Sequence, residues 1–232
     1  MKKLLVLTLV ASMTLGLAAC GSSSSDKAAD TAPAETTEST DKAEDTAEDT
    51  ADAATSDKTW VIAMDTVFRP FEYTDENGEF VGIDVDIINA IAADQNFKVE
   101  LKSLGWDAAV TAVQAGQADA LLAGASITDE RKANGWIFSD SYYDSYQVFT
   151  VKADSGIESL DDLKGKTIAV KNATAGAKYA ADLQEEYGFK IDTYEDSPTM
   201  YQAVVLGQAD ACVEDKPIMA DSIKTGGLDL TI

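Results

Sequence analysis

Charged residues end several short apolar segments of this chain, and they are the first candidates for chemistry. Arg131 ends the segment SITDER, and its planar guanidinium group is the natural bidentate partner of a carboxylate. Asp215 ends the segment ADACVED and can pair with an ammonium group. Arg131 could instead form a surface salt bridge with Asp129 or Glu130. Asp215 could instead cap a helix that starts near Pro217. If neither simpler role applies, the two opposite charges suit a small zwitterion.

Two further segments offer backbone groups to the same kind of ligand. Gly124 allows a close approach of the backbone, and Ser126 supplies an amide and a hydroxyl group. The segment TIAVKN is followed by Thr174, Ala175 and Gly176, which we expect to start a helix. The free N–H groups at a helix start favour an anion. The sequence therefore predicts a second set of donors for a carboxylate.

Composition excludes several classes of chemistry. The chain has 232 residues, contains no histidine, and carries 41 acidic against 18 basic residues, for a formal net charge of -23. Such a negative protein repels phosphate backbones, so we expect no nucleic-acid partner. Imidazole-based metal sites and triads are excluded. Cys20 and Cys212 are too few for a disulfide framework or a thiolate metal site, and we expect no cofactor.

The first 57 residues predict an anchor and a tether. Residues 1–20 contain two lysines, an apolar stretch and the segment LAAC, which resembles the lipobox of bacterial lipoproteins. That resemblance implies a lipid on Cys20, although an ordinary signal peptide with an incidental cysteine is the alternative. Cys212 would then be a small buried apolar residue. Residues 21–57 carry 11 acids and 2 lysines without any aromatic residue, Val, Ile, Leu or Met, so we expect a disordered spacer.

From residue 58 onward, short apolar segments alternate with helical patterns, which predicts an α/β fold with mostly parallel sheets. Asn77-Gly78 additionally predicts a hairpin. The expected strands are 59–65, 97–104, 118–124, 147–152, 167–172, 190–195, 209–215 and 228–232. The expected helices are 84–95, 106–116, 175–188, 198–208 and 217–227, with a short helical turn at 127–134.

One internal similarity suggests two related halves. Residues 112–124 and 203–215 agree at seven of thirteen positions, and both predict a helix end, a glycine turn and a strand. Chance reuse of a common unit is the simpler explanation. Two lobes of similar topology would instead place Gly124 and Asp215 at equivalent strand ends, where ligands of open α/β sheets bind.

Six segments in order resemble the amino-acid-binding components of bacterial ABC importers, which include the glutamine and the lysine/arginine/ornithine binders. The segments are MDTVFRPFEY, VGIDVDI, GASITDERK, FSDSYY, DDLKGKTIAVKNATAG and ADACVED. The resemblance implies the periplasmic-binding-protein type II fold, with two Rossmann-like lobes that close by bending at a hinge. We expect lobe 1 at 58–142, lobe 2 at 143–232 and the hinge at 139–147. In this family the chain returns from lobe 2 to complete lobe 1, so we expect lobe 1 to be incomplete without further residues after Ile232.

The resemblance also implies roles for side chains in the pocket. Phe68 and Trp106 would be aromatic walls, although an aromatic residue at a strand end is often ordinary core. Asp65 would be a polar partner of the ligand side chain, and Lys171 would help to hold a side-chain amide. Thr174 and Ala175 would contact the ligand head group.

Three departures from the family pattern affect specificity. Glu214 precedes Asp215, where the glutamine binder has a neutral or titratable residue. The loop NATAGA carries its glycine one place later than usual, and RKANGWIFSD is one residue longer than usual between Arg131 and FSD. Asp65, Glu214 and Lys171 leave a net negative remainder once Arg131 and Asp215 neutralise the ligand head. We therefore expect a polar ligand side chain that is neutral or cationic, glutamine first and arginine or lysine second.

The expected protein is a monomer that captures a free L-amino acid and delivers it to the transmembrane subunits of an ABC permease. Its only membrane contact would be the lipid anchor on the outer face of the cell membrane. The same fold hosts enzymes, such as cyclohexadienyl (prephenate or arogenate) dehydratases and lytic transglycosylases. Asp65, Glu214 and Asp215 could form an acid/base cluster of that kind. A zwitterion site explains every charge better, so we expect no enzymatic activity.

Overall fold

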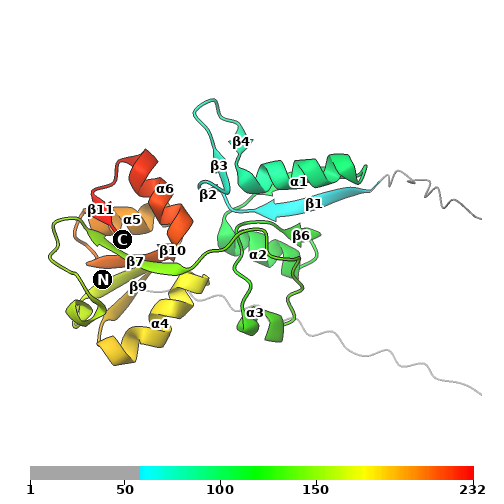
Figure 1. Ribbon diagram of the computed structural model, residues 1–232. Coiled ribbons are helices and arrows are strands. Elements are labelled where there is room, and N and C mark those ends of the chain that lie inside the picture. The colour runs from blue at the N-terminus through cyan, green and yellow to red at the C-terminus, as the bar shows by residue number, and fades with distance from the viewer. Residues whose placement is uncertain (1–57) are drawn as a thin grey trace, which may run out of the picture. The chain divides into compact units, whose positions relative to one another are not determined.

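The computed structural model describes residues 58–232, in which helices and strands alternate along the chain (Figure 1). The predicted leader with its Cys20 and the predicted spacer, residues 1–57 together, lie outside the described residues. None of the helices between Lys58 and Ile232 is long and apolar enough to cross a membrane.

The first half of the described chain, residues 58–142, contains a three-stranded parallel sheet with the order β5-β1-β6 and a small antiparallel sheet with the order β2-β3-β4. Its elements are β1 (Thr59–Met64), β2 (Val67–Phe68), β3 (Glu72–Thr74), β4 (Phe80–Val81), α1 (Ile83–Asp94), β5 (Lys98–Ser103), α2 (Trp106–Gln114), β6 (Ala120–Leu121) and α3 (Asp129–Ala133). Figure 1 shows α1 and α2 on opposite sides of β1. Ile62 and Met64 pack with Val85 of α1, whereas Ala63 packs with Ala109 of α2. Side chains that point to alternate faces of β1 thus pack against both helices.

The second half, residues 143–232, contains a five-stranded sheet with the order β11-β7-β10-β8-β9. Its elements are β7 (Gln147–Lys152), a 3₁₀ helix (Leu160–Leu163), β8 (Thr167–Lys171), α4 (Ala175–Tyr187), β9 (Lys190–Tyr194), α5 (Ser197–Val205), β10 (Ala211–Asp215), α6 (Lys216–Gly226) and β11 (Leu230–Thr231). Cys212 of β10 packs with Met200 of α5 and Met219 of α6, while Val213 packs with Ala180 of α4 on the other face. Cys212 is fully buried, as predicted.

The second sheet is mixed, which corrects the expectation of mostly parallel sheets. Strands β8, β9 and β10 run parallel, but β7 pairs antiparallel with both β10 and β11. Strand β7 follows the crossing segment directly, without the preceding helix that makes a parallel connection possible. The sequence also missed β2 and the 3₁₀ helix. It overestimated β6, which ends at Leu121, so Gly124 lies three residues beyond that strand.

The two similar segments noted in the sequence adopt the same local structure. Asp119 precedes β6, and its carboxylate accepts a hydrogen bond from the backbone N–H of Val61 at 2.9 Å. Asp210 precedes β10, and its carboxylate accepts a hydrogen bond from the N–H of Thr167 at 2.9 Å. In each case the aspartate N–H also donates to the carbonyl of the same partner at 2.8 Å. The similarity therefore reflects a shared way of joining a helix end to a neighbouring parallel strand.

Candidate functional site

All eleven pocket residues predicted from the sequence line one cavity within the described part of the chain, together with Ala123 and Ala125. They are Asp65, Phe68, Trp106, Gly124, Ser126, Arg131, Lys171, Thr174, Ala175, Glu214 and Asp215. The residues come from both halves. Strands β1, β8 and β10 end beside the cavity, α2 and α4 begin there, and the loop after β6 also reaches it. The cavity holds about 20 Å³. This volume suits a single water molecule.

Arg131 is fixed by its backbone and by aromatic rings. Its N–H donates to the Thr128 hydroxyl that caps α3, at 3.2 Å, and its Nη1 donates to the carbonyl oxygen of Ser126 at 2.8 Å. The guanidinium carbon lies 5.0 Å from the ring centre of Trp106 and 5.1 Å from that of Trp136. No ion pair within residues 58–232 joins Arg131 to Asp129 or Glu130, so the surface salt bridge is not its role here. Burial lowers the pKa of Arg131, yet a guanidinium remains charged in proteins.

Asp215 presents a partly bonded carboxylate to the cavity. Its Oδ1 accepts hydrogen bonds from Ser145 Oγ at 2.9 Å and from Gln147 Nε2 at 2.8 Å. Among the described residues no hydrogen bond reaches its Oδ2, which leaves that oxygen for a cation. The residue occupies the N-cap position of α6, but its side chain makes no capping hydrogen bond. Burial raises the pKa of Asp215, and the two donors and the charge of Arg131 oppose this shift.

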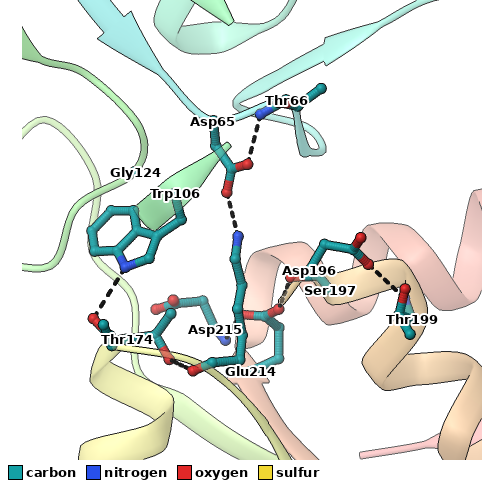
Figure 2. Close-up of polar contacts among 12 residues, drawn as sticks. Asp65, Thr66, Trp106, Gly124, Thr174, Asp196, Ser197, Thr199, Glu214 and Asp215 are labelled. Atoms are coloured by element: carbon teal, nitrogen blue, oxygen red, sulfur yellow. Dashed lines mark hydrogen bonds and ion pairs between the residues drawn. The ribbon is translucent and has the colours of Figure 1, made fainter. Parts of the chain in front are cut away.

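Asp65 and Lys171 form an ion pair between the two halves. Asp65 follows β1 and is 2% exposed, and Lys171 ends β8 and is 3% exposed. Lys171 Nζ donates to Asp65 Oδ2. Asp65 Oδ1 accepts from the N–H of Thr66 at 2.6 Å, a contact that Figure 2 shows. The lysine nitrogen also lies over the ring of Phe68, 5.3 Å from its centre. Phe68 and Trp106 are buried, and both line the cavity together with these charged groups.

Two more hydrogen bonds cross between the halves directly beside this ion pair. Asn172 Nδ2 donates to Asp107 Oδ2 at 2.7 Å, and the indole Nε1 of Trp106 donates to the carbonyl oxygen of Ala173 at 3.0 Å. In Figure 2 the indole nitrogen of Trp106 points toward the loop at Thr174. The last residue of β8 and the two residues that follow it therefore each bond to the first half. We call residues 171–173 the bridging loop.

Helix α4 begins where the sequence predicted a helix start, at Ala175. Thr174 caps the helix, because its hydroxyl accepts from the N–H of Ala177 at 3.1 Å and donates to the carbonyl of Lys171 at 2.7 Å. The N–H groups of the first turn, which include that of Ala175, have no partner inside a helix. A side chain at Gly176 would come within 2.9 Å of the Gln147 amide oxygen and 3.2 Å of a backbone carbonyl. The displaced glycine of NATAGA therefore serves close packing at this helix start.

Gly124 is held by a buried acid that the sequence analysis did not single out. Its N–H donates to Asp84 Oδ2 at 2.8 Å, and its φ of +54° is the left-handed conformation that suits glycine. A Cβ atom there would lie 2.7 Å from the Phe68 ring. Asp84 lies beside Glu72. Burial, and then repulsion from Asp84 and Asp65, raise the pKa of Glu72 to about 11. Burial also raises the pKa of Asp84, and hydrogen bonds, first that from the N–H of Gly124, oppose this shift.

Glu214 lines the cavity, but its carboxylate is bonded to neighbouring residues. Its Oε2 accepts hydrogen bonds from Ser197 Oγ at 2.7 Å and Tyr201 Oη at 2.8 Å, and its Oε1 accepts from the N–H of Asp215 at 3.0 Å. Burial, and next the charge of Asp215, raise the pKa of Glu214. Figure 2 shows Glu214 between Ser197 and Asp215. Three hydrogen bonds therefore engage the Glu214 carboxylate within the described residues.

A larger cavity of about 950 Å³ adjoins the site but lacks its cations. It is lined largely by the loop after β6 and the crossing segment before β7, and it shares Gly124, Ser126 and Asp215 with the smaller cavity. Arg131 and Lys171 line only the smaller cavity. A zwitterion needs both signs of charge, so the smaller cavity is the candidate site.

The chain belongs to a family of binding proteins. Residues 60–210 match the family of bacterial extracellular solute-binding proteins, family 3. The match thus runs from β1 to the residue before β10 and includes Asp65, Arg131 and Lys171 from the site.

Individual relatives extend the match over most of the chain. The arginine-binding extracellular protein ArtP of Bacillus subtilis is 30% identical over 92% of this chain and 72% of its own. Among solved structures, an ancestral arginine-binding protein bound to arginine is 32% identical with a TM-score of 0.68, covering 75% of this chain and 77% of the other. An ancestral arginine-binding protein bound to glutamine is 33% identical with a TM-score of 0.67, over 75% and 76%. These neighbours establish the type II periplasmic-binding-protein fold predicted from the sequence.

Proposed function

We propose that the protein binds a free polar L-α-amino acid outside the cell and delivers it to an ABC importer. The observation that carries this proposal is the meeting of Arg131, Asp215 and the Asp65–Lys171 pair around one cavity. Arg131 and the first turn of α4 suit the ligand carboxylate, and Asp215 Oδ2 suits the ammonium group. The remaining pair then meets the ligand side chain. The family and its relatives are binding proteins, and no observation favours the dehydratase alternative.

Glutamine fits the Asp65–Lys171 pair better than arginine does. A side-chain amide has a carbonyl oxygen that can accept from Lys171 and an NH₂ group that can donate to Asp65. A guanidinium group can use Asp65 only while it faces the like charge of Lys171. The arginine-binding relatives favour arginine instead, and ancestral arginine-binding proteins were solved with arginine and with glutamine. We therefore rank glutamine first and arginine or lysine second.

Isothermal titration of the purified protein against the twenty amino acids tests the proposal. Glutamine should bind most tightly, and aspartate and glutamate should bind weakly at neutral pH, because their side-chain carboxylate would face Asp65. Tight binding of an acidic amino acid contradicts the assigned specificity. If none of the twenty binds, the proposed function itself is wrong.

The proposed delivery route includes a lipid anchor at Cys20 and closure at the crossing segment 139–147. The segment LAAC supports the anchor. Ser145, at the end of the crossing segment, donates to Asp215, which links this segment to the site. Expression of a Cys20→Ala variant in a bacterial host tests the anchor: the variant should lose membrane attachment and incorporate no labelled fatty acid. Equal labelling of both forms contradicts it.

A further inference from the structure

Two indole rings hold the guanidinium group of Arg131. The carbon of that group lies over Trp106 at 5.0 Å and over Trp136 at 5.1 Å from the ring centres. Trp106 is one of the predicted pocket walls. Trp136 is not among the predicted site residues and does not line the small cavity.

The backbone after α3 brings Trp136 to this position. The helix ends at Ala133, and Gly135 reverses the chain with a φ of +87°. The N–H of Trp136 then donates to the carbonyl oxygen of Arg131 itself at 3.0 Å. This turn lies in the segment RKANGWIFSD, and it folds Trp136 back onto the arginine.

Contacts around Trp136 favour one orientation of the ring. The ring stacks on Phe138, with ring centres 5.8 Å apart and an angle of 26° between the planes. The side chain is only partly buried, so it is not a core residue whose main function is to fill space. The aromatic contact with a cation is its distinguishing feature.

Stacking and hydrogen bonding use different parts of a guanidinium group. Its N–H groups lie in the plane of the group, whereas an aromatic ring attracts the cation through the ring face. Nη1 already donates to Ser126, which fixes one part of the in-plane hydrogen bonding. Rings that restrain the group without using its N–H donors leave the remaining donors for a carboxylate. Within residues 58–232 no carboxylate forms an ion pair with Arg131, so these rings and Ser126 provide its restraint.

We infer that Trp136 is a positioning residue for Arg131, which it holds in the orientation that binds the ligand carboxylate. This inference rests on the proposed function, since it assumes that Arg131 anchors an amino acid. Trp136 acts through Arg131 and does not itself touch the ligand.

A double-mutant cycle with Arg131→Ala tests the inference, using L-glutamine and L-arginine as probes in isothermal titration. Trp136→Leu should weaken the better of the two probes by about threefold to thirtyfold, the range expected for a partly desolvated cation–π contact. Trp136→Phe should restore most of this loss. In the Arg131→Ala background, Trp136→Leu should cause no further loss. Trp60→Leu is the matched control, because Trp60 also stacks on a cation, Lys58, at 3.5 Å but lies outside the cavity.

The outcomes separate the inference from the proposed function. If Trp136→Leu weakens binding equally with Arg131 present or absent, its role is structural and the inference is wrong. Unchanged affinity in Trp136→Leu also overturns it. If the unmutated protein binds neither probe nor any other amino acid, the proposed function fails and the inference fails with it. Thermal melts of each variant show whether a loss of binding reflects a loss of folding.

Discussion

Lys171 at the end of β8 forms a buried ion pair with Asp65 at the end of β1. The two residues are 106 positions apart and belong to different halves of the described chain. Each is almost fully buried, so neither charge is compensated by water. Removing one member of such a pair leaves the other charge buried and unpaired, which is strongly destabilising. The pair therefore both joins the halves and sets the charge that a ligand side chain meets.

Replacing Lys171 with methionine should change ligand preference. Without the ammonium group, Asp65 lacks a cation that arginine can supply and glutamine cannot. We expect the ratio of dissociation constants for glutamine and arginine to shift toward arginine by at least about tenfold, since a charged hydrogen bond contributes about 1.5–3 kcal/mol. Isothermal titration with both ligands measures the ratio. Lys166→Met is the control, because Lys166 pairs with Asp210 away from the cavity. An unchanged ratio would show that Lys171 does not face the ligand side chain.

Replacing Arg131 with alanine should weaken binding of the preferred amino acid by at least about thirtyfold. Loss of one member of a desolvated charge pair costs about 2–5 kcal/mol, much of it from the unpaired ligand carboxylate. The neighbouring variant Lys132→Ala should bind like the unmutated protein, because Lys132 is exposed and lies outside the cavity. Equal affinities for Arg131→Ala and the unmutated protein would remove Arg131 from the site.

The sequence predicted the charged site because its members follow recognisable strand and helix patterns. Arg131 and Asp215 end short segments, and their residue types alone indicate which charged groups they can bind. Thr174 precedes a clear helical pattern. The pairing of Asp65 with Lys171 was not predicted, although both residues were assigned to the pocket. Such a contact depends on how the two halves meet, and the local sequence periodicity does not determine this arrangement.

Other features were missed for different physical reasons. Trp136 follows a glycine turn whose direction depends on a left-handed φ angle, which residue types alone do not fix. Glu72 lies in a hairpin that reads as exposed, yet its side chain is fully buried beside Asp84. The direction of β7 was also missed, because the alternation of strand residues does not encode the direction of pairing.

Replacing Trp106 with phenylalanine should accelerate ligand release. Phenylalanine keeps an aromatic wall but lacks the indole N–H that donates to Ala173 across the bridging loop. A hydrogen bond of this kind contributes about 0.5–1.5 kcal/mol, so the dissociation rate should rise about twofold to tenfold. The association rate should change little, because the bond forms only when the halves meet. Stopped-flow fluorescence of the remaining tryptophans measures both rates, with Trp60→Phe as the control. A slower association rate with unchanged release would contradict the assigned role.

Replacing Glu72 with glutamine should flatten the dependence of stability on pH. The folded protein holds the Glu72 proton up to a pKa of about 11, whereas the unfolded chain releases it near 4.5. The stability that this proton supports is therefore complete below pH 4.5 and is lost progressively as pH rises toward 11. Glu72 alone contributes a loss of up to about 1.4 kcal/mol per pH unit in this window. Glutamine has no proton to lose, and its amide can still donate to Asp84, so this loss should disappear.

Denaturant unfolding of both proteins between about pH 6 and pH 8 measures the effect, because this range lies between the Glu72 pKa values of the unfolded and the folded protein. The difference in unfolding free energy should move in favour of Glu72→Gln as the pH rises. Buried acids that do not interact with Glu72, such as Asp215, have raised pKa values and contribute equally to both curves. Glu76→Gln, an exposed change in the same hairpin, should follow the unmutated protein at every pH. Parallel curves for Glu72→Gln and the unmutated protein would mean that Glu72 is ionised in the fold and that Asp84 must be stabilised in another way.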